Sequence, residues 1–185
     1  MELERLRRSV LEGPIVNIDG YPYFVTPLSD GIPRIEPELL NEVADAVIEK
    51  ADLDCDLILA PEAMGIPIAT AVSMKTGIPF VVVRKRRYGL PGEIGIAQKT
   101  GYSESRMFVY TVEKGERVVI LDDVIDSGNT LRASVEELRR SGVTVAEAIA
   151  VFCRNPDIAK LSKELGLPIR CLLDIRVENG KIVIP

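Results

Sequence analysis

The 185-residue chain contains no histidine, and this absence removes several classes of catalytic site. Serine and cysteine enzymes that rely on a histidine base are excluded, and so is every metal centre with histidine ligands. Proton transfer must therefore use carboxylates, lysine, tyrosine or the substrate itself. Cysteine is also scarce, because Cys55, Cys153 and Cys171 are too few and too scattered for a disulfide framework or a cysteine zinc site.

The chain also lacks a long apolar run and an excess of positive charge. No stretch approaches the roughly 18–20 apolar residues of a membrane-spanning helix. The amino-terminal segment MELERLRRSVLEGP alternates charged and apolar residues and has no signal-peptide core. Lysine and arginine total 23 against 28 acidic residues, which disfavours nucleic acid as the main partner. We therefore expect a cytoplasmic protein that binds neither membranes nor nucleic acids.

The length and composition predict a single globular domain that spans residues 1–185. Hydrophobic residues make up 46% of the chain and charged residues 28%, as in folded soluble proteins. Helical spacing near the amino terminus is followed by a hairpin signal at Asp19-Gly20, and a second hairpin signal lies at Asn179-Gly180. Residues 84–117 are poor in helix signals and rich in glycine, serine and charge. Such a region inside a compact domain indicates a flexible functional flap.

Short apolar runs alternate with helical patterns through the rest of the chain. The runs typical of strands covered on both faces are Leu57–Ala60, Phe80–Val83, Val118–Leu121 and Ala148–Val151. Helices are predicted from Pro37 onward and over Ile66–Lys75, Thr130–Arg140 and Pro156–Leu165, the last with Asn155 as its N-cap. This alternation predicts an α/β fold with a doubly wound, mainly parallel sheet.

The segment Val118–Thr130, VVILDDVIDSGNT, carries the most informative pattern. The predicted strand ends in Asp122 and Asp123, at the sheet edge where open α/β proteins bind ligands. The following loop places backbone N–H groups at a helix start, which suits a phosphate, and it has no Walker-type lysine. Paired carboxylates accept hydrogen bonds from vicinal hydroxyls, so the whole segment indicates a ribose 5-phosphate site. Each acid alone is also compatible with simple capping of the loop, but capping does not require two adjacent acids.

This segment resembles the phosphoribosyl diphosphate (PRPP) signature of type I phosphoribosyltransferases, in which two acids and a phosphate loop follow an apolar strand. The resemblance implies the type I phosphoribosyltransferase fold. It also implies that Asp122 and Asp123 hold the ribose hydroxyls. The residues implied to bind the 5-phosphate are Asp126, Ser127, Gly128, Asn129 and Thr130.

Two further segments are similar to the adenine phosphoribosyltransferases and their relatives. Arg84-Lys85 followed by Leu90-Pro91-Gly92 is one, and Pro61–Pro67 resembles the pyrophosphate loop of the purine enzymes. The residues implied to bind pyrophosphate are Ala63, Met64, Gly65, Arg84 and Lys85. Met64 stands where the adenine enzymes usually carry arginine. A cationic pair after a strand would also face the negative charge of a departing diphosphate.

The resemblance also implies where the purine base binds and which segments, a hood and a flap, cover it. Phe24–Leu28 resembles the hood over the purine ring, so residues 1–36 are expected to form an amino-terminal helix and a small hood. Phe24 and Val124 are the implied purine contacts. Arg154, just after the run Ala148–Val151, is a further candidate by position, because a 6-oxopurine needs a donor for its oxygen. The flap corresponds to residues 84–117, and its candidate residues are Gln98, Lys99, Tyr102, Ser103 and Glu104, of which Glu104 is the candidate catalytic residue.

The implied reaction is displacement of pyrophosphate from C1 of the ribose by a nitrogen of the base. Asp126 occupies the place where the hypoxanthine–guanine enzymes carry an acid, and it could accept the proton of purine N7. Mg²⁺ is the expected cofactor, held mainly by substrate and water, so no protein metal ligands are assigned.

The chain is most similar to the archaeal-type hypoxanthine/guanine phosphoribosyltransferases. We expect purine salvage: hypoxanthine or guanine plus PRPP gives IMP or GMP plus pyrophosphate, in a homodimer. The alternatives are the same reaction on adenine or xanthine, or a non-catalytic regulator that senses PRPP or a purine.

Overall fold

The computed structural model describes residues 2–18, 20–99, 104–178 and 181–185, and only the backbone of residues 21, 22, 98, 99, 104 and 105. Its centre is a parallel sheet with the strand order β4-β3-β7-β8-β9. The strands are β3 (Leu57–Pro61), β4 (Phe80–Val83), β7 (Arg117–Ile125), β8 (Thr144–Cys153) and β9 (Ile169–Asp174). The predicted doubly wound α/β fold is therefore confirmed.

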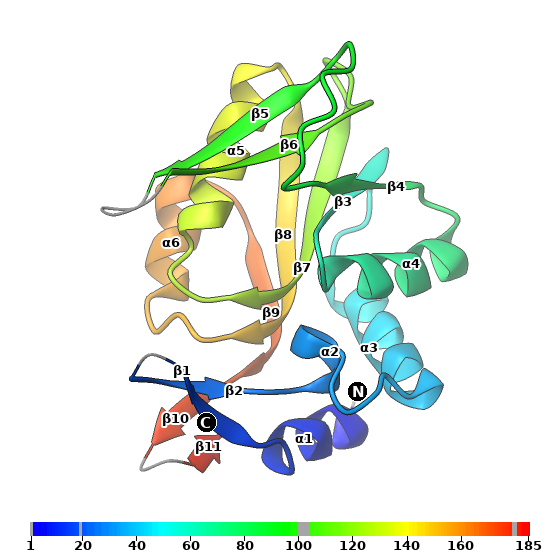
Figure 1. Cartoon of the computed structure of the whole chain (residues 1–185). Coiled ribbons are helices and arrows are strands. Elements are labelled where there is room, and N and C mark those ends of the chain that lie inside the picture. The colour runs from blue at the N-terminus through cyan, green and yellow to red at the C-terminus, as the bar shows by residue number, and fades with distance from the viewer. Residues whose placement is uncertain (1, 19, 100–103, 179–180) are drawn as a thin grey trace.

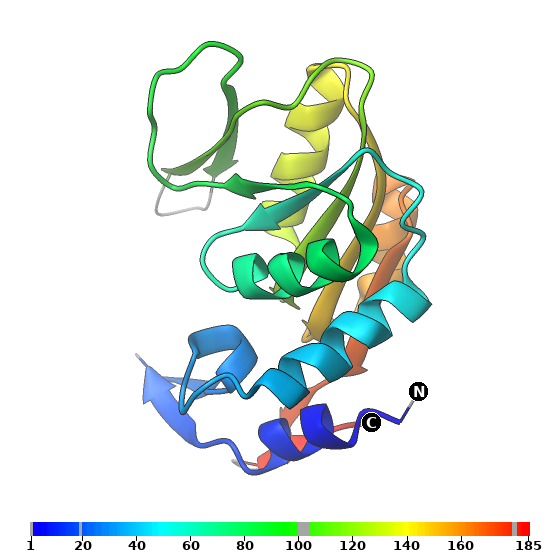
Figure 2. The ribbon, with the colours of Figure 1, turned by 90° about the vertical axis from the view of Figure 1, so that its right-hand side faces the viewer.

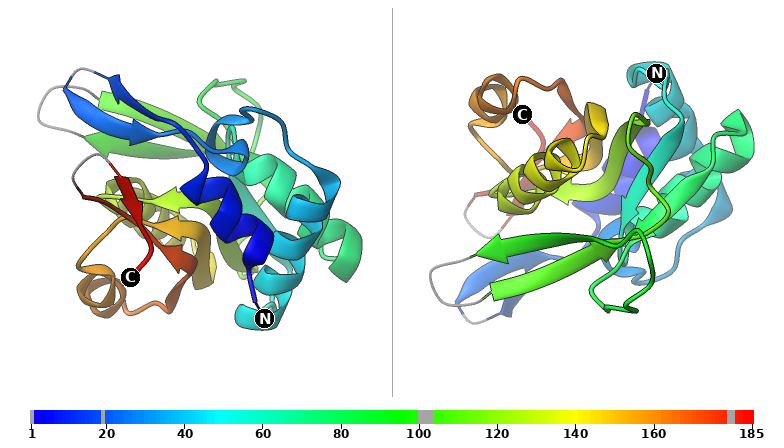
Figure 3. Two further views of the ribbon diagram at one scale, coloured as in Figure 1. Left: turned by 90° about the horizontal axis from the view of Figure 1, so that it is seen from below. Right: turned by 90° about the horizontal axis from the view of Figure 1, so that it is seen from above.

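Helices cover both faces of this sheet, as the views in Figure 1 and Figure 3 show. One face carries α3 (Pro37–Lys50) and α4 (Gly65–Thr76), and the other carries α5 (Asn129–Arg140) and α6 (Ile158–Leu165). Alternate residues of a strand serve opposite faces: Ile58 packs with α3 and α4, whereas Leu59 packs with α5 and α6. This two-sided burial explains the continuous apolar runs of the strands. Among the described helices, none is long and apolar enough to span a membrane.

Two predicted boundaries are wrong, each for a local physical reason. Strand β7 does not end at Leu121 but continues to Ile125, because its residues pair with β8 as far as Ile125 and Cys153. Helix α6 begins at Ile158 rather than Pro156, with Asp157 at the N-cap. The Oδ1 of Asn155 instead accepts a hydrogen bond from the N–H of Asp157, at 2.8 Å, and so closes a turn before the helix.

The amino-terminal segment forms a small layer beneath the carboxyl ends of β7 and β8 (Figure 1). It contains α1 (Glu4–Leu11), the hairpin of β1 (Ile15–Ile18) with β2 (Tyr21–Phe24), and α2 (Pro27–Asp30). The carboxyl-terminal hairpin of β10 (Arg176–Glu178) with β11 (Lys181–Val183) lies beside it (Figure 1). The predicted helix, hairpin and terminal hairpin are thus all present.

The predicted flap region forms an antiparallel hairpin of β5 (Ile94–Lys99) with β6 (Glu104–Val109). Backbone hydrogen bonds of 2.7 Å between Arg84 and Phe108 join it to the end of β4. Ile96 and Val109 are fully buried in the core on the α5 face. Figure 2 shows that the hairpin and the amino-terminal layer project from the same side of the sheet.

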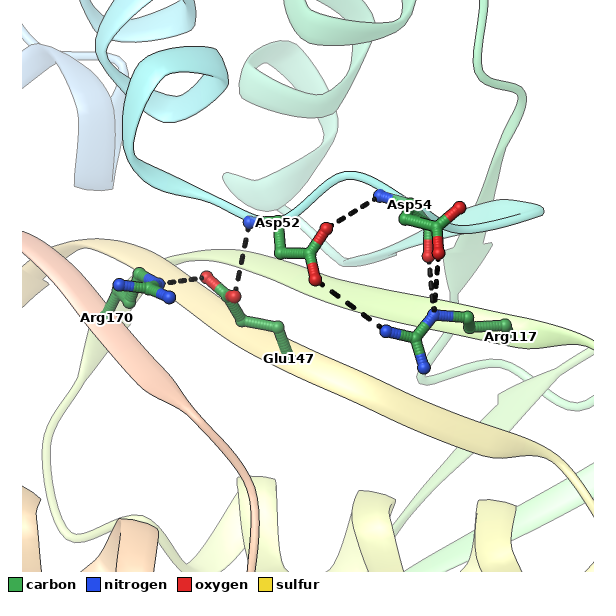
Figure 4. A network of polar contacts seen from close by, with 5 residues as sticks. All are labelled: Asp52, Asp54, Arg117, Glu147 and Arg170. Carbon is green, nitrogen blue, oxygen red and sulfur yellow. Dashed lines mark hydrogen bonds and ion pairs between the residues drawn. The ribbon is translucent and has the colours of Figure 1, made fainter.

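The opposite, amino-terminal edge of the sheet is fixed by a network of charged side chains (Figure 4). Glu147 on β8 is 1% exposed. Its carboxylate accepts hydrogen bonds from Arg170 Nε at 2.9 Å and from the backbone N–H of Asp52 at 3.2 Å. Arg117, the first residue of β7, forms ion pairs with Asp52 and Asp54. Burial raises the pKa of Glu147, although the Asp52 N–H and Arg170 favour its ionised form. The network ties three strands together at the edge far from the predicted site.

Candidate active site

The predicted site residues lie at the carboxyl ends of β3 and β7, the two neighbouring strands from which the chain connections lead to opposite sides of the sheet. Strand β3 leads through α4 to β4 on one side, and β7 leads through α5 to β8 on the other. Connections that diverge in this way create the crevice in which open α/β proteins bind their ligands. Gly65, at the start of α4, allows this helix to pack closely on β7. A side chain at this position would collide with the strand, because its Cβ would lie only 2.9 Å from the backbone oxygen of Leu121.

Asp122 and Asp123 lie near the end of β7 as a closely coupled pair. The N–H of Asp123 donates to Asp122 Oδ1 at 2.9 Å. Burial and the neighbouring charge of Asp123 hold the pKa of Asp122 well above its usual range, while Lys85 acts in the opposite direction. Burial also raises the pKa of Asp123, against hydrogen bonds from Asp122 and Ser29. As carboxylates, both side chains can accept hydrogen bonds from a ligand.

The loop after β7 leads directly into the start of α5. Gly128 is the N-cap of that helix and has φ 77°, the left-handed conformation that glycine adopts most easily. Gly128 has no side chain to cap the first turn of α5, and the N–H groups at this helix start face the side on which an anion can bind. Below the loop lies a cavity of about 140 Å³ whose lining includes Asp122, Asp126, Ser127, Gly128 and Thr130. Asn129, the other residue of the implied phosphate site, is exposed at the first position of the helix.

The loop after β3 brings the implied pyrophosphate residues together. The peptide bond between Glu62 and Ala63 is cis, and α4 begins at Gly65 with Met64 as an N-cap that makes no side-chain hydrogen bond. Glu62 contacts both basic residues that follow β4. Its Oε1 accepts a hydrogen bond from the backbone N–H of Lys85 at 2.6 Å, and its Oε2 forms an ion pair with Arg84 Nε at 3.1 Å. The two basic residues therefore follow β4 on the same edge as the acids of β7.

Comparison with known proteins identifies this arrangement. Residues 32–178 match the family described as phosphoribosyl transferase domain, and this match spans most of the chain. The chain belongs to this family. The hypoxanthine/guanine phosphoribosyltransferase of Methanohalophilus mahii is 48% identical over 182 residues, which are 98% of this chain and 95% of that protein. An HGPRTase-like protein of Halobacterium salinarum is 47% identical over 183 residues, covering 98% of this chain and 96% of the relative.

The fold of the phosphoribosyltransferase is confirmed by solved structures. An adenine phosphoribosyltransferase from Thermoanaerobacter pseudethanolicus superposes with a TM-score of 0.77 at 24% identity, covering 94% of this chain and 99% of that one. The enzyme from Rhodothermus marinus gives a TM-score of 0.72 at 22% identity, covering 93% and 97%. These proteins share the type I fold predicted from the signature segment.

The amino-terminal layer of the phosphoribosyltransferase contains the segment that is predicted to form the hood. Phe24 is 2% exposed and packs edge to face on Phe152, with ring centroids 5.7 Å apart. The guanidinium of Arg154 lies 5.3 Å from the centroid of the Phe24 ring. Val124, the third candidate purine contact, is half-buried on β7 beside the same core. The structure therefore brings the three candidate purine residues to one region, with Phe24 under Arg154 rather than open to solvent.

The flap residues are only partly described. Glu104 opens β6 and Gln98 and Lys99 end β5, but their side chains lie outside the described part of the structure, as do Tyr102 and Ser103 altogether. At the base of the hairpin, Glu93 accepts hydrogen bonds from the Tyr110 hydroxyl at 2.8 Å and from Arg87 Nε at 2.7 Å. The Tyr110 hydroxyl in turn accepts from the Tyr88 N–H. The role of Glu104 stays a prediction.

Sequence reasoning missed the polar residues of α2 that face the acid pair. The hydroxyl of Tyr23 donates to Asp30 Oδ1 at 2.8 Å, and Asp30 Oδ2 accepts from the Thr26 N–H at 2.9 Å. Burial, and then the hydrogen bond to Asp30, raise the pKa of Tyr23 to about 12. Ser29 lies near Asp123 and lowers the pKa of that carboxyl. The signal was present, since Thr26-Pro27 is a typical N-cap and first position of a helix.

Proposed function

We propose that this phosphoribosyltransferase transfers the 5-phosphoribosyl group of PRPP to hypoxanthine and guanine, giving IMP or GMP and pyrophosphate. The observation that carries the proposal is the acid pair, Asp122 and Asp123, beside the loop that begins at Asp126 and leads into the start of α5. Relatives of nearly the same length, 40–48% identical, are named for this activity. The reaction belongs to purine salvage.

In this proposal the two loops divide the substrate between them. Asp122 and Asp123 accept hydrogen bonds from the ribose hydroxyls, and the N–H groups from Ser127 to Thr130 bind the 5-phosphate. The loop at Ala63, Met64 and Gly65, with Arg84 and Lys85, binds the diphosphate. The close approach of Gly65, which follows the loop after β3, to Leu121, which precedes the acid pair on β7, supports this division, because it brings the two binding segments to one edge of the sheet.

The fit of Mg²⁺ to this site follows from its donors. Within the described ranges, no group of three or more acidic or cysteine side chains could hold a metal ion. Asp122 and Asp123 nevertheless present the oxygen donors that Mg²⁺ prefers, and the substrate brings hydroxyl and diphosphate oxygens. Bound Mg²⁺ would supply positive charge at the leaving diphosphate. Arg84 and Lys85 stabilise the same charge from the protein side.

Asp126 is proposed to act on the base. It is exposed, and it lines the cavity between the acid pair and the phosphate loop. A carboxylate there can accept the proton of purine N7 while N9 attacks C1 of the ribose. Arg154 is the proposed donor to the 6-oxo group, since it follows β8 and covers Phe24. The β5–β6 hairpin, with Glu104, is proposed to close over the site and exclude water, which would otherwise attack the activated sugar.

The first test measures pyrophosphate release from PRPP and Mg²⁺ with hypoxanthine, guanine, adenine or xanthine. We expect turnover with hypoxanthine and guanine. Turnover with adenine alone or xanthine alone would refute the base assignment. Retained PRPP binding without turnover on any base would favour the regulator.

The second test replaces the proposed base. Asp126→Asn should lower kcat by about 100-fold, the usual scale for loss of a general base, with little change in PRPP affinity. Asp157→Asn is the matched control, because Asp157 is an exposed aspartate at the neighbouring turn before α6. Equal kcat for the two variants would show that Asp126 does not move the proton.

The third test addresses the ribose. Asp123→Ala should weaken PRPP binding by about 10-fold or more, because a charged acceptor for a hydroxyl is lost. Isothermal titration with PRPP measures this directly, and unchanged affinity would contradict the ribose role. We also propose a homodimer in the cytoplasm, for which light scattering of the purified protein tests the oligomeric state.

A further inference from the structure

Arg132, on the first turn of α5, joins the phosphate loop to the neighbouring helix α6. Its Nε and Nη2 donate to the two carboxylate oxygens of Glu164, at 2.9 and 3.1 Å. Its Nη1 donates to the backbone oxygen of Ser127 at 3.1 Å and to Asn129 Oδ1 at 3.3 Å. One planar guanidinium therefore holds a carboxylate on one side and two residues of the loop on the other.

These contacts fix the peptide unit whose N–H is an expected phosphate donor. The carbonyl of Ser127 and the N–H of Gly128 belong to the same planar peptide and point to opposite sides of it. When Arg132 holds the carbonyl, the direction of the Gly128 N–H is therefore fixed as well. The loop has two other hydrogen bonds among its described residues: a long contact, 3.4 Å, from the Asn129 N–H to Ser127 Oγ, and the first backbone bond of the helix, from the Arg132 N–H to the Gly128 oxygen at 2.9 Å.

Helix α6 supports the loop from below at the same point. A Cβ on Gly128 would lie 2.4 Å from Leu161 Cδ2, so the loop rests directly on this side chain. Glu164, one turn further along α6, orients the guanidinium from its other end. The hydrogen bond from Arg132 lowers the pKa of Glu164, which keeps this partner ionised. Apolar and ionic contacts of one helix thus converge on the Ser127–Gly128 peptide.

We propose that Arg132, oriented by Glu164, is a positioning residue for the phosphate loop. It sets the Gly128 N–H for the 5-phosphate without touching the reacting atoms. This inference rests on the proposed 5-phosphate site. The pair is half-exposed, and such ion pairs contribute little to stability, so its effect should appear in phosphate affinity rather than in unfolding.

The chain offers a matched control on the same helix. Arg139 also joins α5 to α6, because its Nη1 donates to the backbone oxygen of Leu165 at 2.7 Å, but it lies two turns from the loop. Arg132→Ala and Arg139→Ala therefore each remove one tie between the helices, and only the first removes support from the loop. Arg132→Lys retains the positive charge but not the fork of donors.

The experiment measures binding of ribose 5-phosphate by calorimetry, together with the Tm, for the wild type and these variants. Arg132→Ala should bind about 10-fold more weakly, Arg132→Lys should resemble it, and Arg139→Ala should match the wild type. In the turnover assay, Arg132→Ala should raise the KM for PRPP and leave the KM for the purine unchanged. Both alanine variants should unfold within about 3 °C of the wild type.

Three results would overturn the proposal. The first is equal affinity of Arg132→Ala and Arg139→Ala for ribose 5-phosphate. The second is full affinity in Arg132→Lys, and the third is no binding of ribose 5-phosphate by the wild type. Should Arg132→Ala not fold, Glu164→Gln provides the second measurement and should weaken binding several-fold; unchanged affinity would count against the proposal. Binding of ribose 5-phosphate without turnover on any purine would refute the proposed reaction and leave this inference standing.

Discussion

Replacing Gly128 by alanine tests how the phosphate loop is built, because the substitution adds a single methyl group at its centre. Two separate effects oppose it. Gly128 has φ 77°, a conformation that costs a residue with a side chain about 1–2 kcal/mol. The new Cβ would also lie 2.4 Å from Leu161 Cδ2, a side chain that is 1% exposed and cannot move into solvent. Overpacking of this kind costs about 1–3 kcal/mol.

The two effects together predict a loss of about 2–5 kcal/mol from the free energy of unfolding. In a chain of this size each kcal/mol lowers Tm by about 2–4 °C, so a decrease of at least about 4 °C is expected. The phosphate donors would also be displaced, and affinity for ribose 5-phosphate should fall. Gly77→Ala is the matched control, because Gly77 has φ 76° and a Cβ there would meet no atom within 4 Å.

The assay compares thermal unfolding of Gly128→Ala, Gly77→Ala, Leu161→Ala and the double variant Gly128→Ala/Leu161→Ala. The difference between the two glycine variants isolates the collision with Leu161. In the double variant that collision is removed, so its loss of stability should be smaller than the sum of the single losses by about 1–3 kcal/mol. Equal Tm for the two glycine variants, or additive losses in the cycle, would refute the reasoning.

Two other substitutions have defined outcomes. Asp122→Asn should raise the Tm of the free protein at neutral pH by about 2–4 °C while weakening PRPP binding, since a buried carboxyl with a raised pKa destabilises the folded state once it ionises. In the wild type, Asp122 keeps its proton to a higher pH in the folded protein than in the unfolded chain, so the free energy of unfolding should fall as pH rises above about 4, the ordinary aspartate value. The asparagine variant should lose this component of the pH dependence, and parallel stability curves would contradict it. Gly65→Ala should lower the Tm and raise the KM for PRPP, because its Cβ would meet the backbone oxygen of Leu121 at 2.9 Å. An unchanged KM would show that the close packing of α4 on β7 is not needed for PRPP binding.

The sequence predicted the parts of the site that are local. The apolar run before Asp122, the polar residues from Asp126 to Asn129 and the helix that follows are adjacent in the chain, and their pattern alone indicates a strand, a loop and a helix start. The boundary errors at Leu121 and Asn155 have one origin. Pairing with β8 extends β7 beyond its apolar run, and the turn closed by the Asn155 side chain moves the start of α6 along the chain. Hydrophobic periodicity predicts neither effect.

The residues that support the site were not predicted, because their partners are distant in the sequence. Glu62 holds Arg84 and Lys85, and Arg132 bridges Ser127 to Glu164, which lies 32 residues further along the chain. A single charged residue on a helix does not reveal which of many possible partners it will meet. Only the packing of α5 against α6 decides that.

The sequence by itself determined the fold class and the alternation of the five sheet strands with helices, and it carries the prediction that the acid pair and the loop after it bind a ribose phosphate. The tertiary structure decided the strand order β4-β3-β7-β8-β9, the meeting of Gly65 with Leu121, and the position of Ser29 against Asp123. It also set the raised pKa of Asp122, since burial depends on every element packed around the carboxyl. Local patterns record which face of an element is apolar, whereas pairing, register and burial depend on contacts between segments that are far apart in the chain.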